Sequence, residues 1–207
     1  MTEKQINIVP TSLSANLDAY EKEKVIFNVV KLNLYSIIFA ITVGAIFMTI
    51  FLLIWKQSFY TILSLGNIPF YFQIAIFIVL VCLHEVIHAI FFAIFAENKF
   101  KSVKLGIMPA RKLFTPYCHC KEIITIAQYR IIALMPMFIL GILPAVIALV
   151  LKNNALLTWG IMFTIAGFGD FLFLVKLRVE KDDDLVYDLP DEAGFVIYRK
   201  RTAYDPD

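Results

Sequence analysis

The chain carries little charge for its length. Of its 207 residues, 19 are Lys or Arg and 17 are Asp or Glu, so only 17% are charged and the formal net charge is +2. A soluble domain holds about 25% charged residues, whereas 60% of this chain is hydrophobic and its mean hydropathy is +0.76. These values exclude an ordinary soluble domain and predict an integral membrane protein. Nothing in so small a net charge indicates a nucleic acid partner.

Cysteine is also scarce. Cys82, Cys118 and Cys120 make an odd number, and the last two lie in a loop that the charge pattern assigns to the reducing cytoplasm, so disulfides are not expected. No cleavable signal peptide is expected, because the chain before Leu34 is mixed and charged and the first apolar run is too long for a signal.

Four apolar runs are long enough to cross a bilayer, which takes about 20 apolar residues. They extend from Leu34 to Trp55, from Phe70 to Phe95, from Ile131 to Leu151 and from Leu156 to Val175. We therefore expect an all-α membrane protein, a bundle of four transmembrane helices. Residues 34–176 would form the transmembrane domain, between the tails 1–33 and 177–207.

The basic residues predict an orientation. Alternate segments between the runs hold 17 and 2 of the 19 Lys and Arg residues. Because cytoplasmic segments are richer in Lys and Arg, we expect both tails and the loop 97–130 to be cytoplasmic and the protein to be a multi-pass protein of the cell membrane.

Outside the runs, short elements are expected on the cytoplasmic side. Alternating apolar residues indicate short β-strands between Ser102 and Ile126. Phe195 to Tyr198 reads as a strand that pairs with this loop, after a turn at Pro190-Asp191. Asn16 to Lys24 is expected to be a short surface helix.

Glu85 and Asp170 are the only charged residues inside the four runs. An ionisable group at membrane depth costs roughly 3 kcal/mol on insertion scales, so each calls for a specific role. Glu85 lies in His84-Glu85-Val86-Ile87-His88, an H-E-x-x-H pattern. On an α-helix these histidines are about 40° apart around the axis and one turn apart along it, so both can reach one zinc ion. Glu85 is then placed to take a proton from a water at that ion.

Asp170 is the natural third ligand, because catalytic zinc takes three protein ligands. In the predicted topology the second and fourth runs cross in the same direction, and His84 and Asp170 each lie 14 residues beyond the start of their run. Both are therefore about 21 Å below the outer surface. The alternative is a purely structural set of interhelical hydrogen bonds among these polar residues.

Small residues and prolines accompany these positions. Close helix packing near Asp170 is indicated by Gly160, Gly167 and Gly169, although packing alone would explain them equally well. The third run contains Pro136, Gly141 and Pro144, which either loosen that helix beside the site or only shape it.

The chain resembles a known family in several segments. They are His84 to His88, Pro116 to Glu122, Pro136, Gly169-Asp170 and Asp188 to Phe195. These look like a bacterial family of zincin peptidases and are similar to the site-2-protease class of intramembrane zinc metalloproteases. The resemblance implies His84, His88 and Asp170 as zinc ligands and Glu85 as the catalytic acid and base. Asp170 stands in Gly-Asp-Phe, where site-2 proteases have Leu-Asp-Gly.

Motif and resemblance together predict a membrane-embedded zinc metallopeptidase. It would hydrolyse peptide bonds of membrane or membrane-proximal substrates with an activated water. The alternatives are a zinc transporter or binding protein, and a catalytically inert membrane adaptor. Cys118-His119-Cys120 lacks the two-residue spacing of structural zinc sites, so we assign no metal to it and leave its role open.

Overall fold

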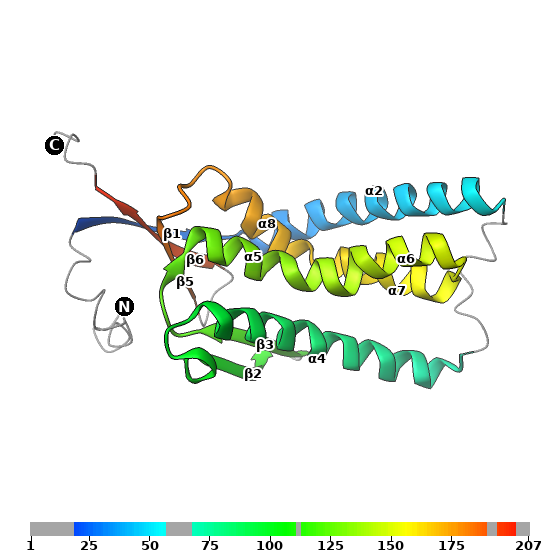
Figure 1. The fold of residues 1–207 in the computed structure, drawn as a ribbon, viewed down its shortest axis with the longest axis horizontal. Helices are drawn as coiled ribbons and strands as arrows, with labels where there is room; N and C mark the ends of the chain where they lie inside the picture. Colours follow the sequence, from blue (N-terminus) through cyan, green and yellow to red (C-terminus); the bar gives the residue numbers. More distant parts are fainter. Residues whose placement is uncertain (1–18, 57–67, 111–112, 190–193, 202–207) are drawn as a thin grey trace. The chain divides into compact units, whose positions relative to one another are not determined.

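The computed structural model describes residues 19–56, 68–110, 113–189 and 194–201. The chain divides into two compact units. One comprises residues 28–87 and 133–175, and the other comprises residues 1–27, 88–132 and 176–207. Both units are built from segments far apart in the sequence, and Figure 1 labels their helices and strands.

In the part of the chain that the structure describes, three helices are long and apolar enough to cross a membrane. The helix α2 (Val29–Trp55) contains the predicted span Leu34–Trp55, and α4 covers Phe70–Phe95 as predicted. The third candidate span runs over Ile126–Leu151 and so begins five residues before the predicted Ile131. Long apolar runs favour helices here because a helix satisfies its own backbone hydrogen bonds.

The third span is one helix of mixed geometry. It consists of α5 (Ile126–Pro136), a π-helical stretch η4 (Met137–Ile142) and α6 (Leu143–Leu151). Pro136 ends α5, and because proline supplies no backbone N–H, the ladder of hydrogen bonds loosens there. The run contains a π-helical segment at this point, a feature that recurs beside functional sites.

The fourth predicted span, Leu156–Val175, is bent. It is a pair of helices, α7 (Asn154–Ala166) and α8 (Phe168–Leu177), that meet at an angle of 46°. Gly167 has φ −74° and ψ 8°, which leaves the helical region, and glycine is a common site of such kinks. The four-helix bundle is thus not confirmed: within the described residues, three helices meet the length for a span, and a fourth is reached only if this bent pair is counted as one.

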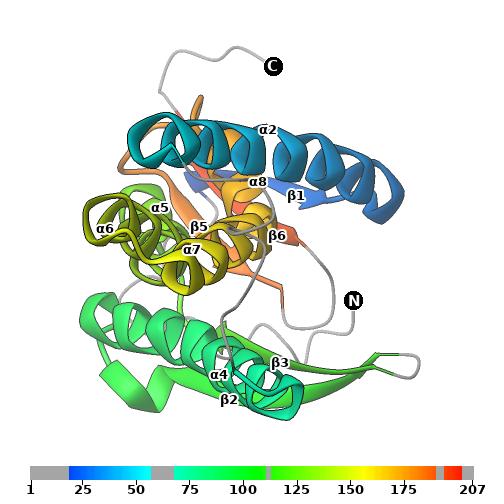
Figure 2. The ribbon, with the colours of Figure 1, turned by 90° about the vertical axis from the view of Figure 1, so that its right-hand side faces the viewer.

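The helices α6 and α7 pack closely as a hairpin (Figure 2). The side chain of Asn153 caps α7 by accepting a hydrogen bond from Leu156 N at 2.9 Å. A Cβ atom at Gly160 would lie 2.6 Å from the backbone nitrogen of Ala145, so only glycine fits at this contact. The same helices and α2 share a fully buried apolar core of Phe51, Ala145, Ala148 and Leu157.

The other unit contains two antiparallel sheets. A four-stranded sheet has the order β1 (Tyr20–Ile26), β6 (Gly194–Lys200), β5 (Leu185–Asp188) and β4 (Ile124–Thr125). A two-stranded sheet pairs β2 (Val103–Ala110) with β3 (Leu113–Cys120), after a short helix η3 (Lys99–Ser102). The strands predicted in the loop and near the C-terminus are confirmed, but β6 pairs with β1 and β5 instead of directly with the loop, and it is β5 that pairs with the loop strand β4.

Two expectations about these segments are wrong. The protein is mostly helical, but it is not all-α, since both terminal segments contribute strands to a sheet. The expected helix at Asn16–Lys24 is instead the strand β1 from Tyr20 onward, and Asn16 to Asp18 and the predicted turn at Pro190-Asp191 lie outside the described residues. The edge of β6 explains the strand, because Tyr20 pairs with Lys200 and Ile26 with Gly194 in register, and pairing overrides weak local helix preference.

Candidate metal centre

Both histidines of the H-E-x-x-H pattern lie on α4. This helix runs without a break from Phe70 to Phe95, since it contains no glycine or proline to interrupt it. His84 and His88 are therefore one turn apart on one face. His84 is half-buried, and His88 is buried.

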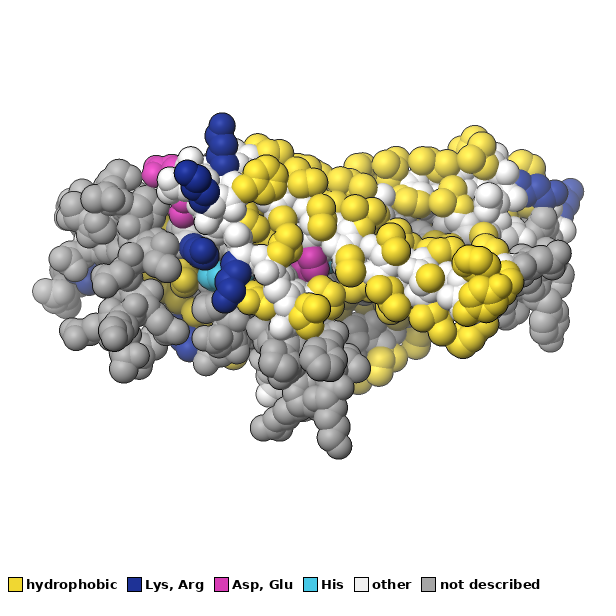
Figure 3. Space-filling model, turned by 90° about the horizontal axis from the view of Figure 1, so that it is seen from below, with side chains coloured by type: hydrophobic (Ala, Val, Ile, Leu, Met, Phe, Trp, Pro, Cys, Tyr) yellow, Lys and Arg dark blue, Asp and Glu magenta, His cyan; other side chains and the backbone are white. Residues whose placement is uncertain are grey.

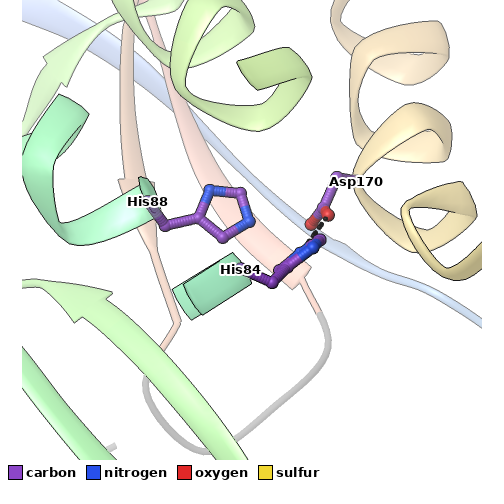
Figure 4. Close-up of side chains that lie close together, drawn as sticks. All are labelled: His84, His88 and Asp170. Atoms are coloured by element: carbon purple, nitrogen blue, oxygen red, sulfur yellow. Dashed lines mark hydrogen bonds and ion pairs between the residues drawn. The ribbon is translucent and has the colours of Figure 1, made fainter. Parts of the chain in front are cut away.

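Asp170 lies in the first turn of α8, just after the bend at Gly167. A carboxylate is stabilised there by the positive end of the helix dipole. Its Oδ2 atom is 3.1 Å from Nε2 of His84, and Figure 4 shows this contact as a dashed line. The two side chains are 13% and 26% exposed, so the contact is partly shielded from the surroundings. The fold thus joins residues 86 positions apart in the sequence.

The three predicted ligands form one group. One donor atom from each of His84, His88 and Asp170 lies within 4.8 Å of the others, and in Figure 4 both imidazoles are turned toward the side of the carboxylate. Nitrogen and carboxylate oxygen bind zinc at about 2.0–2.2 Å, which places the ligands of a tetrahedral ion about 3.3 Å apart. The group therefore fits a zinc ion in donor type, and its donor atoms, which lie up to 4.8 Å apart, would have to draw closer to bind one ion. Its role as a zinc site stays a prediction.

A backbone carbonyl orients His88. Nδ1 of His88 lies 3.1 Å from the carbonyl oxygen of Ile132 on α5. Because a carbonyl oxygen can only accept a hydrogen bond, Nδ1 carries a proton, and in the neutral imidazole Nε2 is then the atom with the free lone pair. Metal-binding histidines in proteins are commonly held in this way by an outer partner. Sequence reasoning missed Ile132, since a backbone carbonyl leaves no signal in the residue type.

Glu85 is half-buried on α4, directly after His84. Hydrophobic side chains cover the helical surface on one face of the molecule, and acidic side-chain atoms show among them (Figure 3). The role of Glu85 as the catalytic acid and base stays a prediction.

His119 does not take part in this group. Its Nδ1 atom lies 3.3 Å from Oδ2 of Asp188 on β5. Among the residues that the structure describes, no second group of three potential metal ligands is found. The contact with Asp188 gives His119 a partner that the sequence did not indicate.

Comparison with known proteins adds one match. A family model described as "Putative zincin peptidase" matches residues 77–185, which is more than half of the 207-residue chain. No curated protein and no solved structure matches the chain. The matched stretch contains His84, Glu85, His88 and Asp170, the residues of the candidate metal centre and its neighbouring carboxylate. The chain therefore belongs to the zincin peptidase family that this model describes.

Proposed function

We propose that this protein is a membrane-embedded zinc metallopeptidase that hydrolyses peptide bonds of membrane or membrane-proximal substrates. The observation that carries the proposal is the convergence of His84, His88 and Asp170, whose donor atoms lie within 4.8 Å of one another. Family membership supports zinc and peptidase chemistry in general terms. The apolar helix around the histidines supports a site at membrane depth.

His84, His88 and Asp170 would hold the metal. When bound, zinc supplies a Lewis acid that polarises the scissile carbonyl and makes a nearby water more acidic. A carboxylate oxygen of Glu85 takes a proton from the attacking water as the water oxygen bonds to the carbonyl carbon. The same carboxyl group then delivers this proton to the nitrogen of the leaving amine as the C–N bond breaks.

The polar groups around the centre prepare it for this role. Ile132 holds the proton of His88 on Nδ1 and so turns the unprotonated Nε2 outward to a ligand position. The first turn of α8 places the Asp170 carboxylate at the positive end of the helix dipole. An ionised Asp170 and an unprotonated Nε2 are the forms that bind a cation.

We further propose that both termini face the cytoplasm, since alternate segments hold 17 and 2 of the 19 basic residues. The partners would then be the lipid bilayer and a membrane protein or peptide substrate. A helical substrate must unwind locally before attack, because its carbonyls are engaged in hydrogen bonds.

The substitution Glu85→Gln tests the proposal. The variant keeps the shape of the side chain but cannot accept the proton, so we expect full zinc content and a loss of cleavage of about 10²–10⁴-fold. Zinc is measured by elemental analysis of the purified protein, and cleavage with a membrane-anchored reporter peptide.

Glu97→Gln is the matched control. Glu97 is an exposed carboxylate just beyond the end of the same helix, and its substitution should change neither quantity. Retained cleavage in Glu85→Gln removes Glu85 from the mechanism. Zinc flux into sealed vesicles without cleavage would favour a transporter instead.

A further inference from the structure

A second polar cluster lies in the unit that contains the two sheets. It consists of His119 on β3, Asp188 on β5 and Tyr129 on α5. Nδ1 of His119 lies 3.3 Å from Oδ2 of Asp188, and the hydroxyl of Tyr129 donates a hydrogen bond of 3.3 Å to Oδ1. Each carboxylate oxygen therefore has one partner, and the three side chains join two strands to a helix.

The cluster is shielded from water. The side chains of His119 and Asp188 are 6% and 16% exposed, and the ring of Tyr187 stands edge-on to His119 at 5.8 Å. Burial raises the pKa of Asp188 above its usual value, while its hydrogen bonds with His119 and Tyr129 oppose that rise. A carboxylate is costly to bury unless it is paired. The presence of the Asp188 carboxylate at this buried position therefore indicates a role beyond packing.

The cluster is connected to the candidate metal ligand His88 through one helix. Tyr129 and Ile132 are three residues apart on α5, which places them about one turn apart. Tyr129 is anchored by Asp188, and the carbonyl of Ile132 accepts the hydrogen bond from His88. On α4, Phe92 lies one turn beyond His88 and stacks edge-on against Tyr129 with ring centroids 6.2 Å apart. The helices α4 and α5 are thus in contact at two successive turns.

We propose that Asp188, His119 and Tyr129 are positioning residues: they hold the first turns of α5 so that the Ile132 carbonyl keeps the His88 proton on Nδ1 and Nε2 toward the metal. The statement that Nε2 faces a metal rests on the proposed function, whereas the placement of the His88 ring and its proton does not. Asp188 lies beyond residues 77–185, the stretch that the family model matches. The C-terminal segment would therefore help to position the candidate metal centre and would not be a separate tail.

The test observes His88 directly. The chain has only three histidines, so ¹⁵N-histidine labelling of the full-length protein gives three ring spin systems, identified by His84→Gln and His119→Gln variants. In the metal-free unmodified protein, we expect His88 as a single Nδ1–H tautomer. In Tyr129→Phe and in Asp188→Asn we expect a mixture of tautomers and a zinc affinity about tenfold weaker, the lower end of what loss of an outer partner costs.

The controls separate positioning from stability. Asp183→Asn removes an exposed carboxylate five residues before Asp188 and should leave the His88 tautomer and zinc affinity unchanged. Thermal unfolding of each variant reports its stability. Tyr129→Phe keeps the ring that packs against Phe92, so it carries the test if Asp188→Asn does not fold.

Each outcome has a definite meaning. A folded Tyr129→Phe variant that keeps one Nδ1–H tautomer and an affinity within about twofold of the unmodified protein overturns the proposal, even if its unfolding temperature falls. A change of His88 tautomer in the metal-free variants supports the positioning role. It does so even where Glu85→Gln retains cleavage or the protein binds no zinc, and in those cases only the peptidase proposal fails.

Discussion

At the scale of single residues, the two histidines of α4 use their ring nitrogens differently. Nε2 of His84 is the atom that meets the Asp170 carboxylate, whereas His88 is held through Nδ1 by the Ile132 carbonyl. Each imidazole therefore has one orientation set by a partner on another helix. This agrees with a preformed site, in which little side-chain entropy is lost when a ligand binds.

Asp170 decides whether the centre has three ligands. We expect Asp170→Ala to weaken zinc binding by more than the roughly 10–100-fold typical of losing an outer-shell partner, since the change removes a donor atom itself. Zinc affinity is measured by competition with a coloured chelator. Asp183→Ala, an exposed carboxylate change, is the control. An unchanged affinity in Asp170→Ala would remove this residue from the ligand set.

At the scale of elements, two glycines allow α7 to approach α6 and the π-helical stretch η4 closely. A Cβ atom at Gly160 would meet the Ala145 backbone at 2.6 Å, and one at Gly167 would meet the Met137 side chain at 2.7 Å. Both glycines therefore serve close packing of α7 and its end, as small residues do between membrane helices. Gly169 is different, because nothing lies within 4 Å of its Cβ position.

Gly160→Val should push α7 away from α6. Overpacking of this kind costs about 1–3 kcal/mol of folding free energy, and α7 leads directly into α8 and Asp170. We therefore expect lower thermal stability together with weaker zinc binding. Gly44→Val is the matched control, since nothing lies within 4 Å of the Cβ position of Gly44 in α2. Equal stability of the two variants would contradict the packing role of Gly160.

At the scale of the whole chain, its two end segments meet in one unit. Arg199 on β6 donates two hydrogen bonds to Glu180, at 2.7 and 2.8 Å, and one to Glu23 on β1, at 2.5 Å. The hydrogen bond from Arg199 lowers the pKa of Glu180, against the opposing effect of burial. Ion pairs as well as strand pairing thus join the segment before the first apolar helix to the segment after the last one.

This network predicts a dependence of stability on pH. Because the pKa of Glu180 is lower in the folded state than its ordinary value of 4.5, its stabilising effect is complete above pH 4.5 and is lost as the pH falls through the folded-state pKa. Glu180→Gln should lower the free energy of unfolding at pH 7 by about 1.5–3 kcal/mol, the value of a hydrogen bond to a charged group.

Unfolding of the two proteins at several pH values measures this effect. The difference between the unmodified protein and Glu180→Gln should shrink below pH 4.5. Glu21→Gln, an exposed change on β1, is the control and should match the unmodified protein throughout. A difference between Glu180→Gln and the unmodified protein that stays constant down to acid pH would assign the stabilisation to something other than the ionised carboxylate.

Some features were predictable from the residues because they follow from local physics. The spans at Leu34–Trp55 and Phe70–Phe95 match the sequence prediction, since a long apolar run without Pro can satisfy its backbone only as a helix. The spacing of His84 and His88 predicted one shared face, because a helix returns to the same side after four residues.

Other features depended on contacts between distant segments. The helix of residues 126–151 starts early because Ile126 N donates to the Asp184 carbonyl from the C-terminal segment, and β1 is a strand because β6 offers a free edge for pairing. Neither partner is near in sequence, so no local pattern signals them.

The sequence by itself determined the apolar helices, the H-E-x-x-H pattern and the two carboxylates within apolar runs, since each depends on residue type and spacing alone. Only the tertiary structure decided that α8 bends away at Gly167, that Asp170 then meets His84, and that Ile132 holds His88. The physical reason is that a contact between helices depends on packing at Gly160 and Gly167 and on the positions of backbone carbonyls. Neither can be predicted from the type of a single residue.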